Sequence, residues 1–160
     1  MAQALASIES EVGAIDVLVN NAGVQHREPL VEVSLDNWQR VLETNLTGAF
    51  VVSRHVARRM LPRRSGKIIN ICSVQTDLAR PAIGPYTAAK GALRNLTRAM
   101  TWEWAGAGLQ INGIASGYIH TPSPSMTPWR PWPSPRTRRS RARSSSASED
   151  TLRLRHPAPP

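Results

Sequence analysis

The apolar positions up to Thr121 follow two periods, one typical of helices and the other typical of buried strands. Spacings of three and four residues predict three helices, which cover residues 2–12, 36–61 and 86–105. Continuous runs of Val, Ile and Leu between turn residues predict three strands buried on both faces, over residues 15–19, 67–72 and 109–115. Helices and strands that alternate in this way form β-α-β units, so we expect a parallel α/β sheet with helices on both faces.

The pattern stops after Thr121, and residues 124–160 follow neither period. This segment holds 8 of the 13 Pro and carries a net charge of +6, whereas residues 1–123 carry only +3. A composition rich in Pro, Arg and Ser does not bury enough apolar surface to pack a core. We therefore expect a structured region over residues 1–123 and a disordered tail over residues 124–160. The basic balance of the chain describes mainly this tail, so it does not indicate a nucleic-acid-binding domain.

Three further features narrow the class of protein. Cys72 is the single cysteine, which excludes an internal disulfide, and its apolar neighbours favour a buried, unreactive thiol. No apolar run approaches the ~20 residues that a membrane span needs. The first 13 residues contain acids but no basic residue, unlike a signal peptide. We expect a cytoplasmic protein with no membrane partner, no specific nucleic-acid partner and no metal site.

Tyr86 and Lys90 are the first candidates for chemistry, because they are four residues apart at the start of a predicted helix. This spacing places both side chains on one face, one turn apart. An ammonium group so close stabilises the phenolate form of a Tyr, which makes the Tyr able to exchange a proton. Taken alone, the pair also fits two exposed helix residues with no function.

Small and polar residues follow all three predicted strands. Asn20-Asn-Ala-Gly23 follows the first strand, Ser73 follows the second, and Gly117 and Thr121 follow the third. The carboxyl ends of parallel strands meet at one edge of the sheet, where open α/β sheets bind their ligands. The sequence therefore predicts a ligand site at this edge, with Ser73 able to hydrogen-bond a substrate oxygen beside Tyr86.

These pieces, in this order, resemble the short-chain dehydrogenase/reductase family. The matching parts are Asn20-Asn-Ala-Gly23, Asn45 within Thr-Asn-Leu-Thr-Gly, Ser73 at 13 residues before Tyr86, Lys90, and residues 112–121. The resemblance implies a partial Rossmann-like, doubly wound parallel sheet that contains the central-to-C-terminal strands only. It also implies an oxidoreductase that interconverts a secondary alcohol and a ketone with NAD or NADP.

The resemblance assigns a role to each matching residue. Tyr86 would be the acid–base residue, and Lys90 would assist it while holding the nicotinamide ribose. Ser73 would orient the substrate carbonyl, and Asn45 would hold a water that links Lys90 to solvent. A helix-interior Asn with only local hydrogen bonds is the alternative for Asn45. The implied cofactor contacts are Asn21, Ala22, Gly23, Tyr86, Lys90, Gly117, Ile119 and Thr121.

A narrower resemblance, over residues 66–100, is to the gluconate 5-dehydrogenases, also called 5-keto-gluconate reductases. Ser73-Val-Gln75 and the Ala-Arg-Pro at Arg80 carry it. It makes Gln75 and Arg80 candidate contacts for a sugar acid or polyol, together with Ser73 and Tyr86. The alternative for Gln75 and Arg80 is that they are solvated loop residues. It also implies that intact relatives are homo-oligomers that pack through the two long helices.

The sequence departs from the family at both ends. The family's first three strands, its first two helices and its Gly-rich phosphate-binding turn have no counterpart, which indicates a truncated chain. We expect its first strand to form an exposed edge of the sheet, and we expect weak or no cofactor binding by the isolated chain. Ser116-Gly117 stands where the family has Pro-Gly, and the tail reads like the product of a shifted reading frame.

Two other functions remain open. The chain could be a non-catalytic remnant or subunit that packs through its two long helices. Alternatively, the Arg-rich tail could bind polyanions, with Trp129 and Trp132 stacking on bases.

Overall fold

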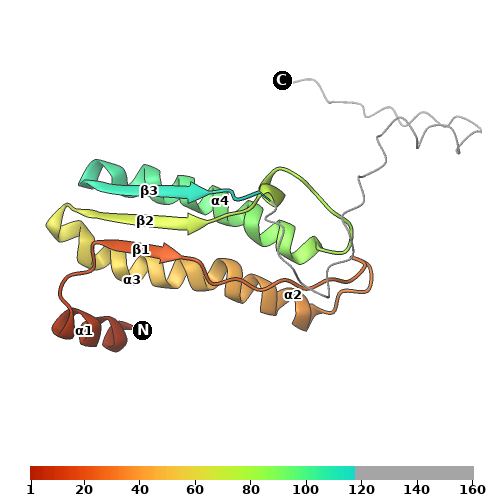
Figure 1. Ribbon diagram of the computed structural model, residues 1–160, viewed down its shortest axis with the longest axis horizontal. Helices are drawn as coiled ribbons and strands as arrows, with labels where there is room; N and C mark the ends of the chain where they lie inside the picture. Colours follow the sequence, from red (N-terminus) through yellow and green to blue (C-terminus); the bar gives the residue numbers. More distant parts are fainter. Residues whose placement is uncertain (118–160) are drawn as a thin grey trace, which may run out of the picture. The chain divides into compact units, whose positions relative to one another are not determined.

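Three parallel strands form the sheet of the computed structural model, which describes residues 1–117 (Figure 1). The strands are β1 (Val17–Asn20), β2 (Gly66–Ile71) and β3 (Leu109–Ile114), in the order β1-β2-β3. These are the three predicted strands, shifted by one or two residues. The α/β class and the partial Rossmann-like sheet are confirmed, whereas the predicted disordered tail lies outside the described residues.

The helices also follow the prediction, with one interruption. They are α1 (Ala2–Glu11), α2 (Leu35–Leu42), α3 (Gly48–Arg63) and α4 (Gly84–Trp104), with short 3₁₀ turns at Val74–Thr76 and Ala105–Ala107. The predicted helix over residues 36–61 is divided by a π-helical turn, η1 (Glu43–Thr47), between α2 and α3. The Ser34 hydroxyl caps α2 by accepting a hydrogen bond from the Asn37 amide at 3.2 Å, as its place before the apolar pattern predicts.

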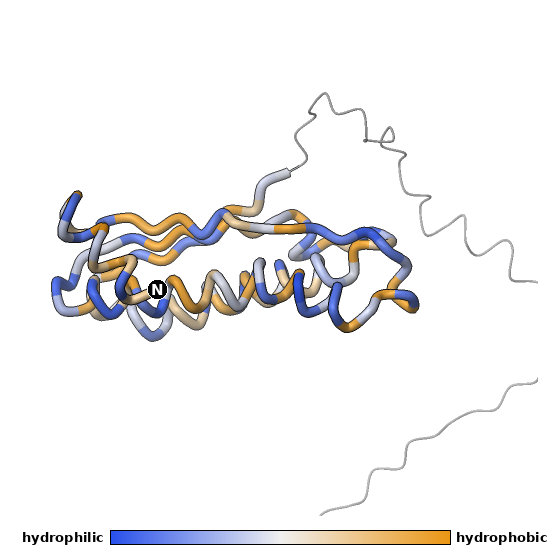
Figure 2. Tube along the Cα trace, turned by 90° about the horizontal axis from the view of Figure 1, so that it is seen from below, coloured by the Kyte–Doolittle hydropathy of each residue, from blue (hydrophilic) through white to orange (hydrophobic). Residues whose placement is uncertain are grey.

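Both long helices, α3 and α4, lie on the same side of the sheet (Figures 1 and 2). The prediction that helices cover both faces is therefore wrong for the described residues. The strand order explains the difference, because each connection moves to the next strand in the same direction across the sheet. Two right-handed crossovers made in one direction place both helices on one face.

The other face of the sheet, which we call the outer face, is partly exposed. Val17, Val19 and Ile114 are each about half exposed, at 50%, 51% and 50%. The prediction of strands buried on both faces is thus wrong for β1 and β3. In the described part of the chain β1 pairs only with β2, so β1 forms the exposed edge that was expected.

The inner face, under the helices, changes character along the strands. Near the amino ends of the strands it is an apolar core, in which Met60, Ile68 and Leu109 pack together. Near the carboxyl ends it carries Asn20 and Asn70, which are register partners on β1 and β2. Among the helices that the structure describes, none has both the length and the apolar character to cross a membrane.

Candidate active site

Lys90 lies at the centre of the candidate site, at the carboxyl end of β2. Pro85 in the first turn of α4 favours a helix start there, which brings Tyr86 and Lys90 to the strand ends. Lys90 is only 4% exposed, and its Nζ donates a hydrogen bond to the Ile71 carbonyl at 2.5 Å. Its Nζ also lies 5.8 Å from the centroid of the Tyr86 ring. The structure therefore brings the two residues of the predicted pair together. The alternative, that both are exposed helix residues with no function, is wrong for Lys90, because Lys90 is buried.

Burial shifts the pKa of Lys90. Loss of hydration lowers the pKa of the Lys90 ammonium, and the neighbouring Cys72 sulfur raises it in part. Burial likewise raises the pKa of the Cys72 thiol, although Lys90 and the Thr97 hydroxyl oppose this change. The Cys72 thiol is thus held in its neutral form, in agreement with the unreactive thiol that the sequence predicts.

Gly23 lies close to both Asn45 and Lys90. A Cβ atom on Gly23 would lie 3.0 Å from Asn45 Oδ1 and 3.8 Å from Lys90 Nζ. The absence of a side chain at Gly23 therefore leaves this position open beside an amide oxygen and an ammonium group, and we call the position the gap at Gly23. A polar gap lined by backbone suits the close approach of a ligand's hydroxyl groups.

The π-helical turn holds Asn45 in place. The Gly48 amide bonds to the Glu43 carbonyl, five residues back, and π turns of this kind occur frequently at functional sites. Asn45 Oδ1 accepts from the Val24 amide at 2.8 Å, and Asn45 Nδ2 donates to the Val24 carbonyl at 2.7 Å. The alternative of purely local hydrogen bonds is therefore wrong for Asn45. Its side chain joins η1 to the loop after β1.

Ser73 and the substrate candidates lie in the loop that follows β2. Ser73 is 8% exposed, and its hydroxyl accepts a hydrogen bond from the Gln75 amide at 3.2 Å. Gln75 is buried and Arg80 is half-buried, so neither is the fully solvated loop residue of the alternative reading. Their contact with a substrate stays a prediction.

The predicted cofactor residues fall into two groups. Asn21, Ala22 and Gly23 follow β1 directly and are exposed, as residues that face a ligand would be. Gly117 is the last described residue, and it too is exposed. Ile119 and Thr121 lie outside the described residues. No group of three or more His, Cys, Asp or Glu side chains that could hold a metal ion occurs within residues 1–117.

Four hydrogen-bonded side chains beneath the site were not predicted. Asn20 Nδ2 donates to Ser53 Oγ and to Asn70 Oδ1, both at 2.8 Å. Asn70 Nδ2 donates to Thr97 Oγ1 at 2.9 Å. We call these four side chains, Asn20, Ser53, Asn70 and Thr97, the polar layer. The signal that could have revealed it is the Asn inside the apolar run 67–72, which needs partners if it is buried.

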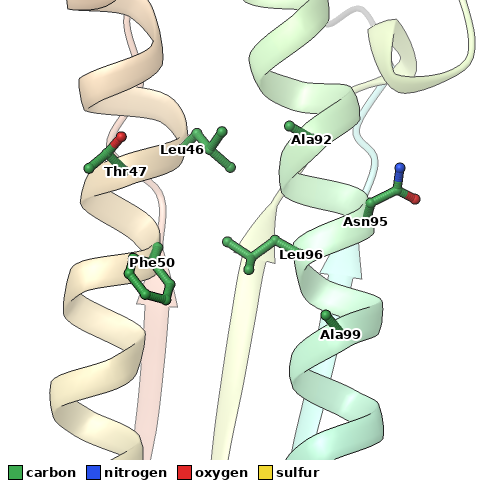
Figure 3. Close-up of a pocket in the computed structure, with 7 residues that line it drawn as sticks. All are labelled: Leu46, Thr47, Phe50, Ala92, Asn95, Leu96 and Ala99. Atoms are coloured by element: carbon green, nitrogen blue, oxygen red, sulfur yellow. The ribbon is translucent and has the colours of Figure 1, made fainter.

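A separate groove lies between η1–α3 and α4, on the helix surface (Figure 3). Its volume is about 550 Å³, and its lining is formed by Leu46, Thr47, Phe50, Ala92, Asn95, Leu96 and Ala99. Tyr86 and Lys90 are not among these residues. The groove is therefore distinct from the candidate active site.

Comparisons with known proteins agree with this geometry. A sequence profile for short chain dehydrogenases matches residues 1–130. Gluconate 5-dehydrogenase of Gluconobacter oxydans (strain 621H) is 55% identical over 117 residues, which are 73% of this chain and 46% of that protein. 5-Keto-D-gluconate 5-reductase of Escherichia coli (strain K12) is 50% identical over 118 residues, 74% of this chain and 46% of that protein.

A solved structure gives the same result. The crystal structure of a gluconate 5-dehydrogenase from Burkholderia cenocepacia J2315, in complex with NADP and tartrate, superimposes with a TM-score of 0.72 at 53% identity. The match covers 75% of this chain and 47% of that one, so this chain spans less than half the length of such relatives. The profile covers most of the chain, and those matching motifs that lie within residues 1–117 are found near the carboxyl ends of the strands. The chain therefore belongs to the short-chain dehydrogenase family.

Proposed function

We propose that this chain carries the proton-transfer part of an NAD(P)-dependent oxidoreductase that interconverts a secondary alcohol and a ketone. One observation carries the proposal. Lys90 is buried at the carboxyl end of β2, with Tyr86 one turn before it and with Asn45 also beside the gap at Gly23. An arrangement of a phenol, an ammonium and an amide at a strand end suits proton exchange with a substrate oxygen.

In the reductive direction, Tyr86 gives its phenolic proton to the ketone oxygen, and in the oxidative direction it takes the proton of the alcohol. Lys90 stabilises the phenolate that remains, because a cation beside a phenolate offsets its charge. The Ser73 hydroxyl holds the substrate oxygen in place. When bound, the nicotinamide supplies or accepts the hydride.

The cofactor contacts are proposed for Asn21, Ala22 and Gly23 at the end of β1, with Lys90 on the ribose hydroxyls. The gap at Gly23 supports this assignment, because a Cβ there would crowd Asn45 Oδ1 and come into contact with Lys90 Nζ. The Burkholderia relative is described in complex with NADP. Ile119 and Thr121 complete the proposed set, together with Gly117.

A sugar acid is the substrate class that we propose, with gluconate and 5-keto-D-gluconate as the specific candidates. The names of the Gluconobacter and Escherichia relatives support it, at 55% and 50% identity. In this chain Arg80 offers a guanidinium that can pair with a carboxylate, and Gln75 offers an amide for hydroxyl groups.

A chimera tests the function without relying on the isolated chain. The matching 117-residue segment of the Gluconobacter enzyme would be replaced by its counterpart from this chain. We expect the chimera to oxidise gluconate with NADP, and we expect Tyr86→Phe to lower kcat by about 10²- to 10⁴-fold. Trp102→Phe is the matched control, because Trp102 is an aromatic on the same helix that is 90% exposed. A Tyr86→Phe chimera with an unchanged rate would contradict the proposal.

The isolated 160-residue chain is expected to bind NADPH weakly or not at all, because its sequence has no Gly-rich phosphate-binding turn. Isothermal titration calorimetry checks this expectation. Binding with a micromolar Kd would overturn it.

A second copy of this chain is our proposed occupant of the groove between η1–α3 and α4. Two small residues, Ala92 and Ala99, leave it open, and Phe50 at its wall is 39% exposed. Sedimentation of the chain should show a mass above that of a monomer, and Ala92→Glu should lower it. Gln110→Glu, an exposed change on β3, serves as the control. A monomeric wild-type chain would refute this part.

A further inference from the structure

The polar layer lies directly beneath the candidate active site, and it connects the elements that build the site. Asn20 and Asn70 are in β1 and β2, whereas Ser53 is in α3 and Thr97 is in α4. Both helices are also connected to the polar groups of the site, because α4 contains Lys90 and α3 continues from η1, which contains Asn45. Thr97 is seven residues after Lys90, about two turns of α4, and Ser53 is eight residues after Asn45.

Three members of the layer are buried, Asn20 is half-buried, and the bonds between them are well formed. Ser53 and Asn70 are 0% exposed, and Thr97 is 7% exposed. Both hydrogens of Asn20 Nδ2 are used, and Asn70 both accepts and donates. The Thr97 hydroxyl donates its own hydrogen to the Leu93 carbonyl at 2.7 Å, so its oxygen accepts from Asn70. The donors therefore run outward from Asn20 in β1, on one side to Ser53 in α3 and on the other through Asn70 in β2 to Thr97 in α4.

Stability alone does not account for such a layer. Well-packed apolar side chains of similar volume usually stabilise a core as well as buried polar groups or better. Hydrogen bonds add something that apolar contact lacks, because they fix the distance and direction between the atoms they join. In α4 the Thr97–Asn70 bond and the Lys90–Ile71 bond attach the helix to two consecutive residues of β2.

We propose that the polar layer positions Lys90 and Asn45 beside the gap at Gly23. Its members are positioning residues, because they touch neither the gap nor Tyr86 in any contact described above. Thr97 and Asn70 hold the α4 side, which carries Lys90. Ser53 and Asn20 hold the α3 side, which continues from Asn45. The inference rests on the proposed function in one respect only, which is that the gap at Gly23 receives the cofactor.

Lysine titration tests the α4 side in the intact 160-residue chain. Lys67 and Lys90 are its two lysines, so NMR of ¹³Cε-labelled lysine follows Lys90 with the exposed Lys67 as an internal reference. The Cys72 thiol interacts with both Lys90 and the Thr97 hydroxyl, so the variants are made in a Cys72→Ala background. Thr97→Val removes the hydroxyl at nearly constant volume, and we expect the Lys90 midpoint to rise because the ammonium becomes better hydrated. Thr97→Ser keeps the hydroxyl and should keep the midpoint of that background.

Val56→Ala is the matched control, since it removes buried atoms from the apolar core and leaves every hydrogen-bonding group of the polar layer in place. We expect it to lower stability and to leave the Lys90 midpoint in place. If Thr97→Val lowers stability in the same way and the Lys90 midpoint does not move, the layer is only structural and the proposal is wrong.

Hydrogen exchange tests the α3 side independently, and it applies even if Thr97→Val does not fold. The Val24 amide donates to Asn45 Oδ1, so its exchange rate reports how firmly Asn45 is held. Ser53→Ala should raise this rate by about tenfold, whereas Val56→Ala should not raise it selectively. An unchanged rate in Ser53→Ala would overturn the proposal for that side.

Neither measurement needs cofactor or turnover. A chimera without activity would therefore count against the proposed function alone, and an unmoved Lys90 midpoint in an active chimera would count against the positioning role alone.

Discussion

The interior beneath the sheet has two halves that are built from different chemistry. Near the amino ends of the strands, Met60, Ile68 and Leu109 form an apolar core. Near the carboxyl ends, the inner face carries Asn20 and Asn70, which are register partners. Asn20 bonds to Ser53 in α3, and Asn70 bonds to Thr97 in α4. The same sheet and the same two helices line both halves. The difference teaches that the apolar half supplies stability, whereas the polar half supplies fixed geometry under the site.

The largest effect should come from the site above the polar half. In the chimera, Lys90→Met should lower kcat by about 100-fold or more, because the phenolate of Tyr86 loses its neighbouring cation. Steady-state kinetics measure this change, and the exposed Lys67→Met is the control. Equal losses in both variants would remove the distinction between the two halves.

The apolar half should respond in stability instead. Met60 is 0% exposed, so Met60→Ala should lower the free energy of unfolding by about 2–5 kcal/mol. Urea unfolding followed by circular dichroism gives this value. The chimera that carries Met60→Ala should keep its kcat wherever it remains folded, and a kcat reduced as far as in Lys90→Met would break the comparison.

A change in the polar half should cost less stability than a change in the apolar half. Asn70→Ala leaves Asn20 and Thr97 without their partner, which should lower the free energy of unfolding by about 1–3 kcal/mol. The same urea titration measures it. A loss as large as that of Met60→Ala would show that the polar half is a main source of stability.

The smallest effect concerns alkaline pH, where Lys90 and Cys72, two neighbours in the site above the polar half, change the stability in opposite directions. Folding lowers the pKa of Lys90 below its ordinary 10.5, so the unfolded chain binds more protons between the two values and stability rises with pH there. Folding raises the pKa of Cys72 above its ordinary 9.0, so the folded chain binds more protons above 9.0 and stability falls with pH.

Single substitutions should separate these two contributions. In Cys72→Ala, the free energy of unfolding should still rise with pH because of Lys90. In Lys90→Met, it should still fall with pH because of Cys72. Urea midpoints measured over a series of alkaline pH values provide the test. Parallel pH profiles for the two variants would contradict the opposed signs.

The sequence predicted the fold well where local patterns decide it. The period of the apolar positions located the three strands and the long helices, and Ser34 marked the start of α2. The sequence did not predict that α3 and α4 lie on the same face of the sheet. Periodicity shows which side of a helix is buried but not on which face of the sheet that helix lies. The half-exposed outer face of β1 and β3 was missed for the same reason, since an apolar run does not show whether helices cover both faces of its strand.

The site divides in the same way. Tyr86 and Lys90 could be paired from their spacing, because four residues make about one turn wherever a helix occurs. The bonds of Asn45 to Val24 and of Asn70 to Thr97 could not be predicted in this manner. They join residues 21 and 27 positions apart, and only the packed fold brings them together.

The π-helical turn also constrains how the length of this segment can vary. Each residue of an α-helix advances the chain by about 100° around the helix axis. The π-helical turn holds one residue more, because the Gly48 amide bonds to the Glu43 carbonyl five residues back. Asn45 lies inside this turn, and its side chain bonds to both the amide and the carbonyl of Val24. Deleting Thr44 would change the angular position of Asn45 around the helix axis relative to α2 or to α3. The number of residues in the turn therefore sets the direction in which the Asn45 amide faces Val24.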